Sequence, residues 1–210
     1  MRLGIVLRVR ILLVIPLMLI GGPFVRADRV ILAPNGKKIP MGNYRFEHFF
    51  DQSRHERFRT SLGFGVTEAI DAEITYEERN DKVFSIDVSY NFVPAVVGIS
   101  PGISVGVRDA LGKTEDGRFY YLAVTQKVGQ FGELSSDVPA EITLGLAFGD
   151  VIEPIVGVML PFRESFRILA DYDATRINAG LEYRPMNDLW IRWIHREKQS
   201  LWSLTYVLRL

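Results

Sequence analysis

Hydrophobic and polar residues alternate one by one over much of the chain, and the alternation is clearest in the final segment, LWSLTYVLRL. One face of this segment is apolar and partly aromatic, formed by Trp202, Leu204, Tyr206, Leu208 and Leu210. The other face carries Ser203, Thr205 and Arg209, with Val207 as its apolar exception. Because successive side chains of a strand point to opposite sides, the pattern predicts a strand with one apolar and one polar face. It suits the lipid-facing wall of a membrane barrel, although an edge strand of a soluble sandwich shows the same pattern.

The same period of two recurs from Gly42 onward and predicts about twelve strands. They are residues 43–50, 58–66, 70–77, 83–91, 102–109, 118–128, 140–148, 155–160, 166–173, 176–184, 189–196 and 201–210. Several connections are short, namely 80–82, 173–175, 185–188 and 197–200. An even number of strands with short connections predicts an antiparallel up-and-down barrel with both termini on one side.

The composition of the two faces decides which face meets lipid. The polar face is rich in small residues, which suit a crowded interior: Gly63, Gly65, Gly106, Gly145 and Gly180. The apolar face carries aromatic residues near strand ends, as in the girdles of membrane barrels: Tyr44, Tyr76, Tyr90, Tyr172, Tyr183 and Trp202. The predicted fold class is therefore all-β, a transmembrane antiparallel up-and-down β-barrel of about 12 strands. A secreted, lipocalin-like soluble barrel is the alternative.

Residues 1–27 have the features of a cleaved signal peptide. Arg2, Arg8 and Arg10 precede the short apolar run of residues 11–20, and small residues end at Ala27. The apolar run is shorter than the roughly 20 residues of a transmembrane helix, the alternative interpretation. We therefore expect residues 28–210 to form a single outer-membrane barrel domain. Residues 28–40, with several turn formers, are expected to be a lead-in to the first strand.

The net charge and the absence of cysteine exclude some classes of partner and site. The predicted signal peptide holds four of the 25 Lys and Arg and none of the 25 Asp and Glu, so the rest of the chain carries a net charge of −4. Nucleic acid is not expected as a partner, because phosphate binding needs clustered positive charge. The chain has no Cys, which excludes disulfides and thiolate metal sites.

The sequence offers little support for catalysis. None of the three histidines, His48, His55 and His195, has the Ser and acidic neighbours of a nucleophilic triad. His195 shares a face with Ile191 and Trp193, which indicates a position near the aromatic girdle. No spacing of His, Asp and Glu suggests a metal site, so neither a cofactor nor a metal is expected.

Charged residues of both signs occupy the predicted inner face. They are Arg45, Glu47, Arg59, Glu73, Asp87, Arg108, Lys127, Glu141, Arg167, Asp171, Glu182, Arg184, Arg192 and Arg209. The candidates for a pore or selectivity lining are Arg108, Asp171, Asp173, Glu182, Arg184, Arg192 and Arg196. The alternative is a salt-bridged interior that fills a narrow barrel. If odd-numbered strands run outward, Arg108 and Arg196 lie near the extracellular mouth, where Arg108 is expected to bridge to Asp171 or Asp173.

Two stretches resemble the YjbH-type outer-membrane barrels associated with exopolysaccharide production. Residues 101–112 read PGISVGVRDALG and lead into FYYLAVTQK at 119–127, and residues 169–183 read LADYDATRINAGLEY. In that family a Gly-Val/Ile-Arg-Asp turn precedes a strand that ends in Lys, and a later acidic-Tyr-Asp sequence runs into Asn-Ala-Gly-Leu. Residues 34–45 also fit the family's entry into its first strand. The resemblance implies an outer-membrane barrel linked to polysaccharide.

The sequence thus predicts an outer-membrane β-barrel with a polar, charged lumen. It would act as a channel for small polar solutes or as an accessory to envelope polysaccharide export. A plugged barrel with a structural or docking role is the first alternative, and a membrane-embedded hydrolase is the second. Expected partners are outer-membrane lipid and, because the chain ends on a hydrophobic strand, the barrel-assembly machinery during biogenesis.

Overall fold

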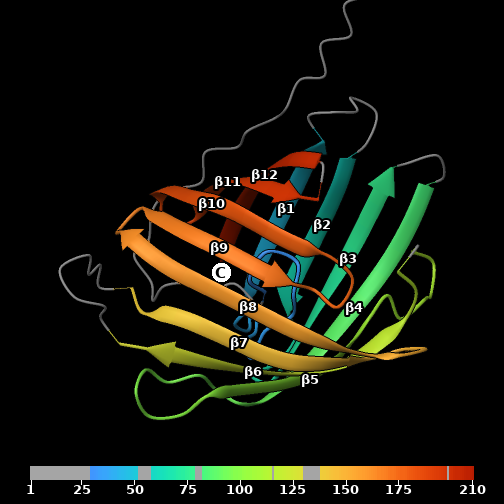
Figure 1. The fold of residues 1–210 in the computed structure, drawn as a ribbon, viewed down its shortest axis with the longest axis horizontal. Coiled ribbons are helices and arrows are strands. Elements are labelled where there is room, and N and C mark those ends of the chain that lie inside the picture. The colour runs from blue at the N-terminus through green and yellow to red at the C-terminus, as the bar shows by residue number, and fades with distance from the viewer. Residues whose placement is uncertain (1–28, 52–57, 79–81, 115, 130–137, 198) are drawn as a thin grey trace, which may run out of the picture.

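The computed structural model describes residues 29–51, 58–78, 82–114, 116–129, 138–197 and 199–210 (Figure 1). These residues form twelve strands. The strands are β1 (Asn43–Asp51), β2 (Phe58–Gly65), β3 (Ile70–Glu78), β4 (Lys82–Val93), β5 (Gly102–Arg108), β6 (Phe119–Val128), β7 (Ala140–Phe148), β8 (Ile152–Arg163), β9 (Phe166–Tyr172), β10 (Ile177–Met186), β11 (Leu189–Arg196) and β12 (Gln199–Arg209). None of the described residues belongs to a helix long and apolar enough to cross a membrane.

The strands form one closed antiparallel barrel in which each strand pairs with its neighbours in sequence. Closure is made by β1 and β12, which pair from Asn43 with Arg209 to Asp51 with Leu201. We call the end where β1 begins and β12 ends the termini rim, and the opposite end the far rim. The predicted fold class, an all-β up-and-down barrel of twelve strands, is confirmed.

The predicted strand boundaries agree closely with the structure, and β8 is the main exception. The sequence predicted a strand only over residues 155–160, whereas β8 runs from Ile152 to Arg163. Its inner face is apolar at Ile155 and Met159, so its two faces could not be told apart in the sequence. The predicted signal peptide lies outside the described residues.

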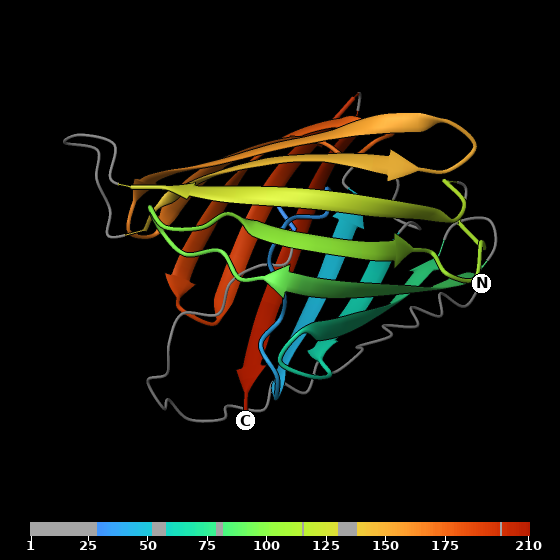
Figure 2. The ribbon, with the colours of Figure 1, turned by 90° about the horizontal axis from the view of Figure 1, so that it is seen from below.

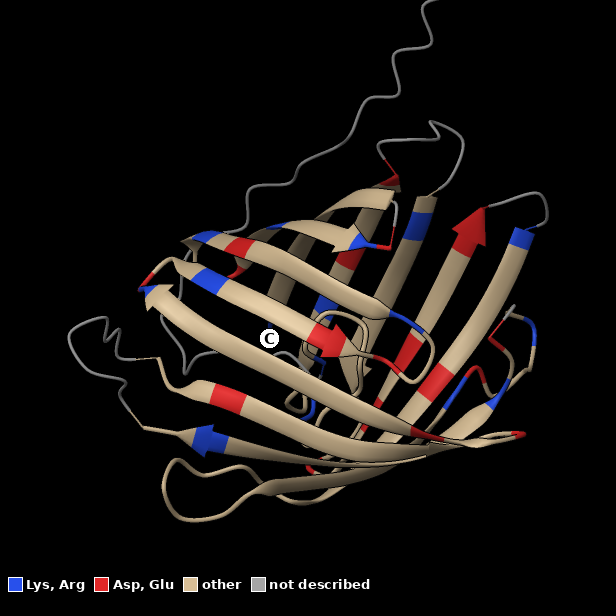
Figure 3. Ribbon diagram, viewed as in Figure 1, with Lys and Arg blue, Asp and Glu red and all other residues tan. Residues whose placement is uncertain are grey.

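The outer surface of the barrel is apolar on every strand. Exposed hydrophobic residues on β1 to β12, one from each, are Phe46, Leu62, Ile74, Tyr90, Val105, Leu122, Leu144, Val156, Ile168, Leu181, Trp193 and Leu204. Figure 3 shows that charged residues of both signs are also spread along the strands. Many of these charged side chains are buried, including Glu47, Arg167 and Arg192. A polar interior inside an apolar wall is the arrangement of a transmembrane barrel.

Residues 29–40 lie inside the barrel, and we call them the plug. Both Figure 1 and Figure 2 show this blue segment enclosed by the strands. The expectation that this stretch is only a lead-in to β1 is therefore wrong. Most of its residues are buried, with Ile31 and Ala33 fully so. The alternative of a filled barrel describes the lumen better than an open pore does.

Candidate functional site

The plug crosses the lumen from the termini rim, and close backbone contacts define its path. The Pro40 carbonyl lies where a Cβ on Gly65 of β2 would be, so only glycine fits there. Further along, Gly36 packs backbone to backbone on Gly102 of β5, and either residue would collide if it carried a Cβ. The Gly36 N–H donates to the hydroxyl of Thr125 on β6 at 2.7 Å. Glycines on both the plug and the wall therefore permit the close approach.

A single carboxylate on β9 holds the tip of the plug. Oδ2 of Asp171 accepts the backbone N–H groups of Ile31, Leu32 and Ala33 at 2.7, 2.9 and 3.0 Å. Successive backbone N–H groups that converge in this way form an anion-binding nest. The other oxygen of Asp171 accepts from the side-chain amide of Asn178 at 2.7 Å. Because the carboxylate is buried, these four donors supply the partners it would otherwise take from water.

Charged residues of the plug pair with buried carboxylates of the wall. Arg29 forms ion pairs with Glu47 on β1 and, at 2.9 Å, with Glu73 on β3. Lys37 pairs with Glu141 on β7. The cations therefore contact opposite sides of the barrel, because β7 lies far around the wall from β1. Breaking one such pair leaves an uncompensated buried charge, which is strongly destabilising.

The tip of the plug also completes an apolar core. Val30, Ile31 and Leu32 pack in one cluster with inward-facing residues of four strands, Phe49, Met159, Leu169 and Ile194. A Cβ added to Gly157 of β8 would meet Val30 at 2.6 Å, so the wall is shaped to the plug there as well. Apolar side chains inside a water-filled pore would be unfavourable, and the plug removes them from water.

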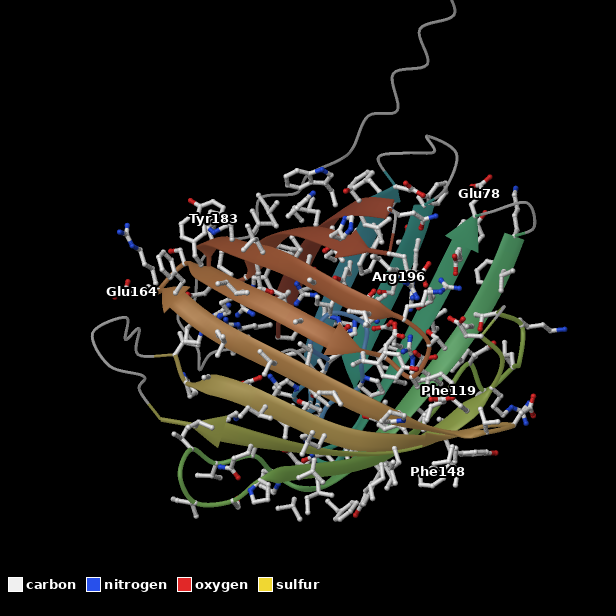
Figure 4. The ribbon with its side chains drawn as sticks, in the orientation of Figure 1. Glu78, Phe119, Phe148, Glu164, Tyr183 and Arg196 are labelled. Carbon is white, nitrogen blue, oxygen red and sulfur yellow. The ribbon has the colours of Figure 1, made fainter. Side chains whose placement is uncertain are left out.

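A cavity of about 110 Å³ lies between the plug and the far rim, and we call it the vestibule. Its wall includes three arginines and several carboxylates, among them Arg59, Arg108, Arg196, Asp87, Asp109 and Asp173. Leu32 of the plug forms part of its floor, and Phe119 of β6 lies in its wall. Figure 4 labels Arg196 and Phe119 on the inner side of the barrel.

Three of the candidate lining residues meet in the vestibule, namely Arg108, Asp173 and Arg196. Arg196 pairs with Asp173 at 3.5 Å. The expected bridge from Arg108 to Asp171 or Asp173 is wrong. Among the described residues, the Arg108 guanidinium pairs with Asp87 at 3.5 Å and donates to the Leu32 carbonyl at 2.9 Å. Asp171 is occupied instead by the backbone of the plug.

The remaining candidates form a separate buried cluster centred on Glu182 of β10. Its carboxylate accepts from Arg167 at 2.7 Å, from Arg192 at 2.7 Å and from Arg184 at 2.5 Å. Arg192 continues to Glu47 at 3.2 Å. The Arg184 guanidinium lies 3.9 Å from the ring centre of Trp190. These groups fill the lumen with paired charges, as the salt-bridged alternative predicted.

Two carboxylates in the turns of the far rim are held ionised. Burial by itself would raise the pKa of Asp173, but hydrogen bonds from Thr175 and the Arg176 N–H, with nearby Arg108 and Arg196, lower it below its ordinary value. Burial likewise opposes the charge of Asp109, yet donors from residues 112–114 lower its pKa on balance. Both groups thus remain negative at neutral pH.

The two described histidines lie outside the lumen. His48 is on the outer side of β1, where its Nδ1 is 2.7 Å from the Thr60 hydroxyl and its ring packs on Phe50 at 4.2 Å. His195 is exposed on the face expected for it, and His55 lies outside the described residues. Neither described histidine can act as the base that activates a nucleophile in the lumen. Within the described ranges, no group of three His, Asp or Glu could hold a metal.

The plug and its partners were not predicted from the sequence, although one signal was present. Leu169 and Ile194 stand on faces that otherwise carry Arg167, Asp171 and Arg192. An apolar side chain on a lumen-facing position indicates that something other than water covers it.

A scan against protein-family models and a search of curated proteins found no match. Among solved structures, the chain is similar to a KdgM porin at 9% identity, covering 80% of this chain and 99% of that one, with a TM-score of 0.46. A KdgM porin in complex with disordered oligogalacturonate aligns at 10% identity over 80% and 99%, with a TM-score of 0.49. The N-terminal β-barrel domain of Pseudomonas aeruginosa OprF aligns at 17% identity over 80% and 98%, with a TM-score of 0.27. With TM-scores below 0.5, these similarities add nothing to the fold assignment, which rests on the closed strand order.

Proposed function

We propose that the protein is an outer-membrane barrel kept closed by residues 29–40, and that displacement of this plug opens a polar path for small solutes. The observation that carries the proposal is the capture of three plug N–H groups by Asp171. The captured residues, 31–33, lie under the vestibule and across the lumen from the rim where the plug enters. They thus close the path between the two rims.

The plug can leave without dismantling the wall. Every strand of the barrel already has two neighbours, so no wall strand depends on residues 29–40 for its backbone pairing. The plug is held by side chains, chiefly Asp171, Glu47, Glu73 and Glu141. Water can solvate these carboxylates once the lumen is hydrated, which lowers the free energy needed for displacement.

The proposed location and partners follow from the wall and the sequence. The apolar residues exposed on every strand suit contact with the acyl chains of outer-membrane lipid. The predicted signal peptide would deliver the chain to the envelope, and the barrel-assembly machinery would insert it. The termini rim would then face the periplasm and the vestibule would face outward.

Planar-bilayer conductance tests the proposal directly. We expect the native protein to show small, rare openings. A variant in which residues 29–38 are replaced by a Gly/Ser linker of equal length should show a stable conductance many times larger. Heat-modifiable gel mobility reports whether each protein has folded. A folded linker variant that stays closed would refute the plug, and a native protein with a steady large conductance would refute the closed state.

The plugged structural or docking barrel is the second candidate, favoured by how completely the plug is bonded. On that view the linker variant would conduct, whereas the native protein would never open under any voltage or ligand. The link to envelope polysaccharide rests on the resemblance of residues 101–112, 119–127 and 169–183 to YjbH-type barrels. Loss of secreted polysaccharide on deletion of the gene, restored by the native chain, is the result that this link requires.

A further inference from the structure

The arginines of the vestibule are bound much more loosely than those deeper in the lumen. Among the described residues, the shortest ion pair of Arg59 is 3.9 Å, to Glu73, and those of Arg108 and Arg196 are 3.5 Å each. In the deep cluster, Arg167 and Arg192 both lie 2.7 Å from Glu182. A guanidinium has five N–H donors in a planar fork, and at 3.5 Å or more it makes no strong hydrogen bond to its carboxylate. Arg108 uses one donor on the Leu32 carbonyl at 2.9 Å, and the vestibule arginines keep their other donors for another acceptor.

Three carboxylates of the vestibule, by contrast, each accept short hydrogen bonds, although Oδ1 of Asp109 has no partner among the described residues. Asp87 accepts from the backbone N–H of Asp109 at 2.8 Å. Asp109 accepts from the N–H and the hydroxyl of Thr114 at 2.6 and 2.8 Å. Asp173 accepts from the Thr175 hydroxyl at 2.7 Å and from the backbone N–H of Arg176 at 2.9 Å.

The other three acids also have partners. Asp116 lies 3.7 Å from Arg176, and Asp51 and Glu77 both have interactions of their own. Acids outnumber arginines in the wall, so a bare count of charge favours a cation. The available hydrogen-bond donors nevertheless favour an acceptor, and directional donors decide what a partly desolvated site binds.

Two aromatic rings lie against two of these three arginines. The guanidinium of Arg59 lies over the ring of Phe49 at 5.9 Å, and that of Arg108 lies over Phe119 at 5.5 Å. Cation–π contacts of this kind hold a guanidinium in place without using its N–H groups. The rings and Leu32 of the plug also give the cavity apolar walls. The cavity of about 110 Å³ is smaller than an engineered cavity of about 150 Å³ that holds benzene, which limits its ligand to a small organic molecule.

We propose that the vestibule is a binding site for a small oxyanion, a carboxylate-bearing solute, held by Arg59, Arg108 and Arg196. The planar forks of the arginines match the two oxygens of a carboxylate, which a lysine could not do. The site goes beyond the proposed function, and its occupancy does not depend on displacement of the plug. A barrel that never opens but binds the anion would support the anion site and contradict the displaceable plug. A barrel that opens but does not bind the anion would support the plug and contradict the site.

Calorimetric titration of the full chain in detergent at low ionic strength tests the site with three probes of similar size. Malonate is the dianion, malonamide its neutral counterpart and 1,3-diaminopropane the dication. We expect malonate to bind at least about 10-fold more tightly than malonamide, because hydrogen bonds to charged groups are the strong ones. Diaminopropane should bind no better than malonamide. This comparison uses the native protein only, so it does not depend on whether any variant folds.

Single substitutions then assign the site. Arg59→Gln and Arg196→Gln should each weaken malonate binding about 10-fold. Arg163→Gln removes the same charge from an exposed position at the end of β8 on the termini rim and should leave binding unchanged. Tighter binding of diaminopropane, absence of any malonate preference, or an equal loss in Arg163→Gln would overturn the proposal.

Discussion

The carboxylate of Asp171 is the most informative single group to remove. Asp171→Ala leaves the N–H groups of residues 31–33 without an acceptor, and a buried, unsatisfied donor costs about 1–3 kcal/mol. Even at the lower figure, three donors sum to about 3 kcal/mol if no water enters. A change of 3 kcal/mol shifts a two-state equilibrium about 150-fold. The displaced plug should therefore become about 100 times more populated, and Asp171→Asn, which keeps one acceptor, should have a smaller effect.

Thiol labelling measures the displaced population without relying on conductance. The chain has no Cys, so Val30→Cys adds a single, nearly isosteric thiol at a buried position of the plug. We expect slow maleimide labelling in this background and labelling about 100-fold faster with Asp171→Ala. Asp188→Ala is the control, because Asp188 pairs with Arg209 at the termini rim, away from the plug tip. Equal labelling rates in the Asp171→Ala and Asp188→Ala proteins would refute the role of the nest.

Three further outcomes test the lipid face, the backbone contact and the far rim. Leu204→Arg on the outer face should destabilise the folded barrel by about 2–4 kcal/mol and Leu210→Arg at the rim by about 0–1 kcal/mol. The folded fraction in heat-modifiable gels should therefore be lower for Leu204→Arg than for Leu210→Arg. Gly36→Ala should speed labelling of the plug, because its Cβ collides with a β5 carbonyl, whereas Gly129→Ala meets no atom within 4 Å and should not. The lowered pKa of Asp173 stabilises the fold above its unfolded value of about 3.9. The difference in melting temperature between the native protein and Asp173→Asn should therefore be constant from pH 8 to 5 and shrink below about pH 4.

The wall could be predicted from the sequence because each strand contains its own information. Alternation of period two identifies a strand, and its faces follow from parity without knowledge of any other segment. Thr205 and Leu204 are inward and outward as predicted, fully buried and 37% exposed respectively. The rule failed at β8, where Ile155 and Met159 make the inner face as apolar as the outer one.

The plug could not be predicted in the same way because it has no period of its own. Its conformation depends on residues far away in sequence, such as Asp171, which is 140 positions from Ile31. The turn formers Pro34 and Gly36 indicate an irregular segment but not its location. The signal lay on the wall, where Leu169 and Ile194 turn apolar side chains toward the lumen.

Polar residues of the lumen form hydrogen bonds with the backbone of the plug, a role that the interpretation as a pore lining did not include. The Val30 N–H of the plug donates to the Ala33 carbonyl at 3.1 Å. A buried irregular segment leaves most of its N–H and C=O groups unpaired within itself, so the wall must supply partners for them. Asp171, Thr125 and Asp71 accept from plug N–H groups. In return, Ser104 and Asn91 donate to the carbonyls of Asn35 and Gly36, both at 2.7 Å. A lining selected for conduction would leave such groups facing water. The matching of wall side chains to plug backbone groups therefore indicates that the closed state is built into this barrel, and that any open state must replace these bonds with water or with a bound solute.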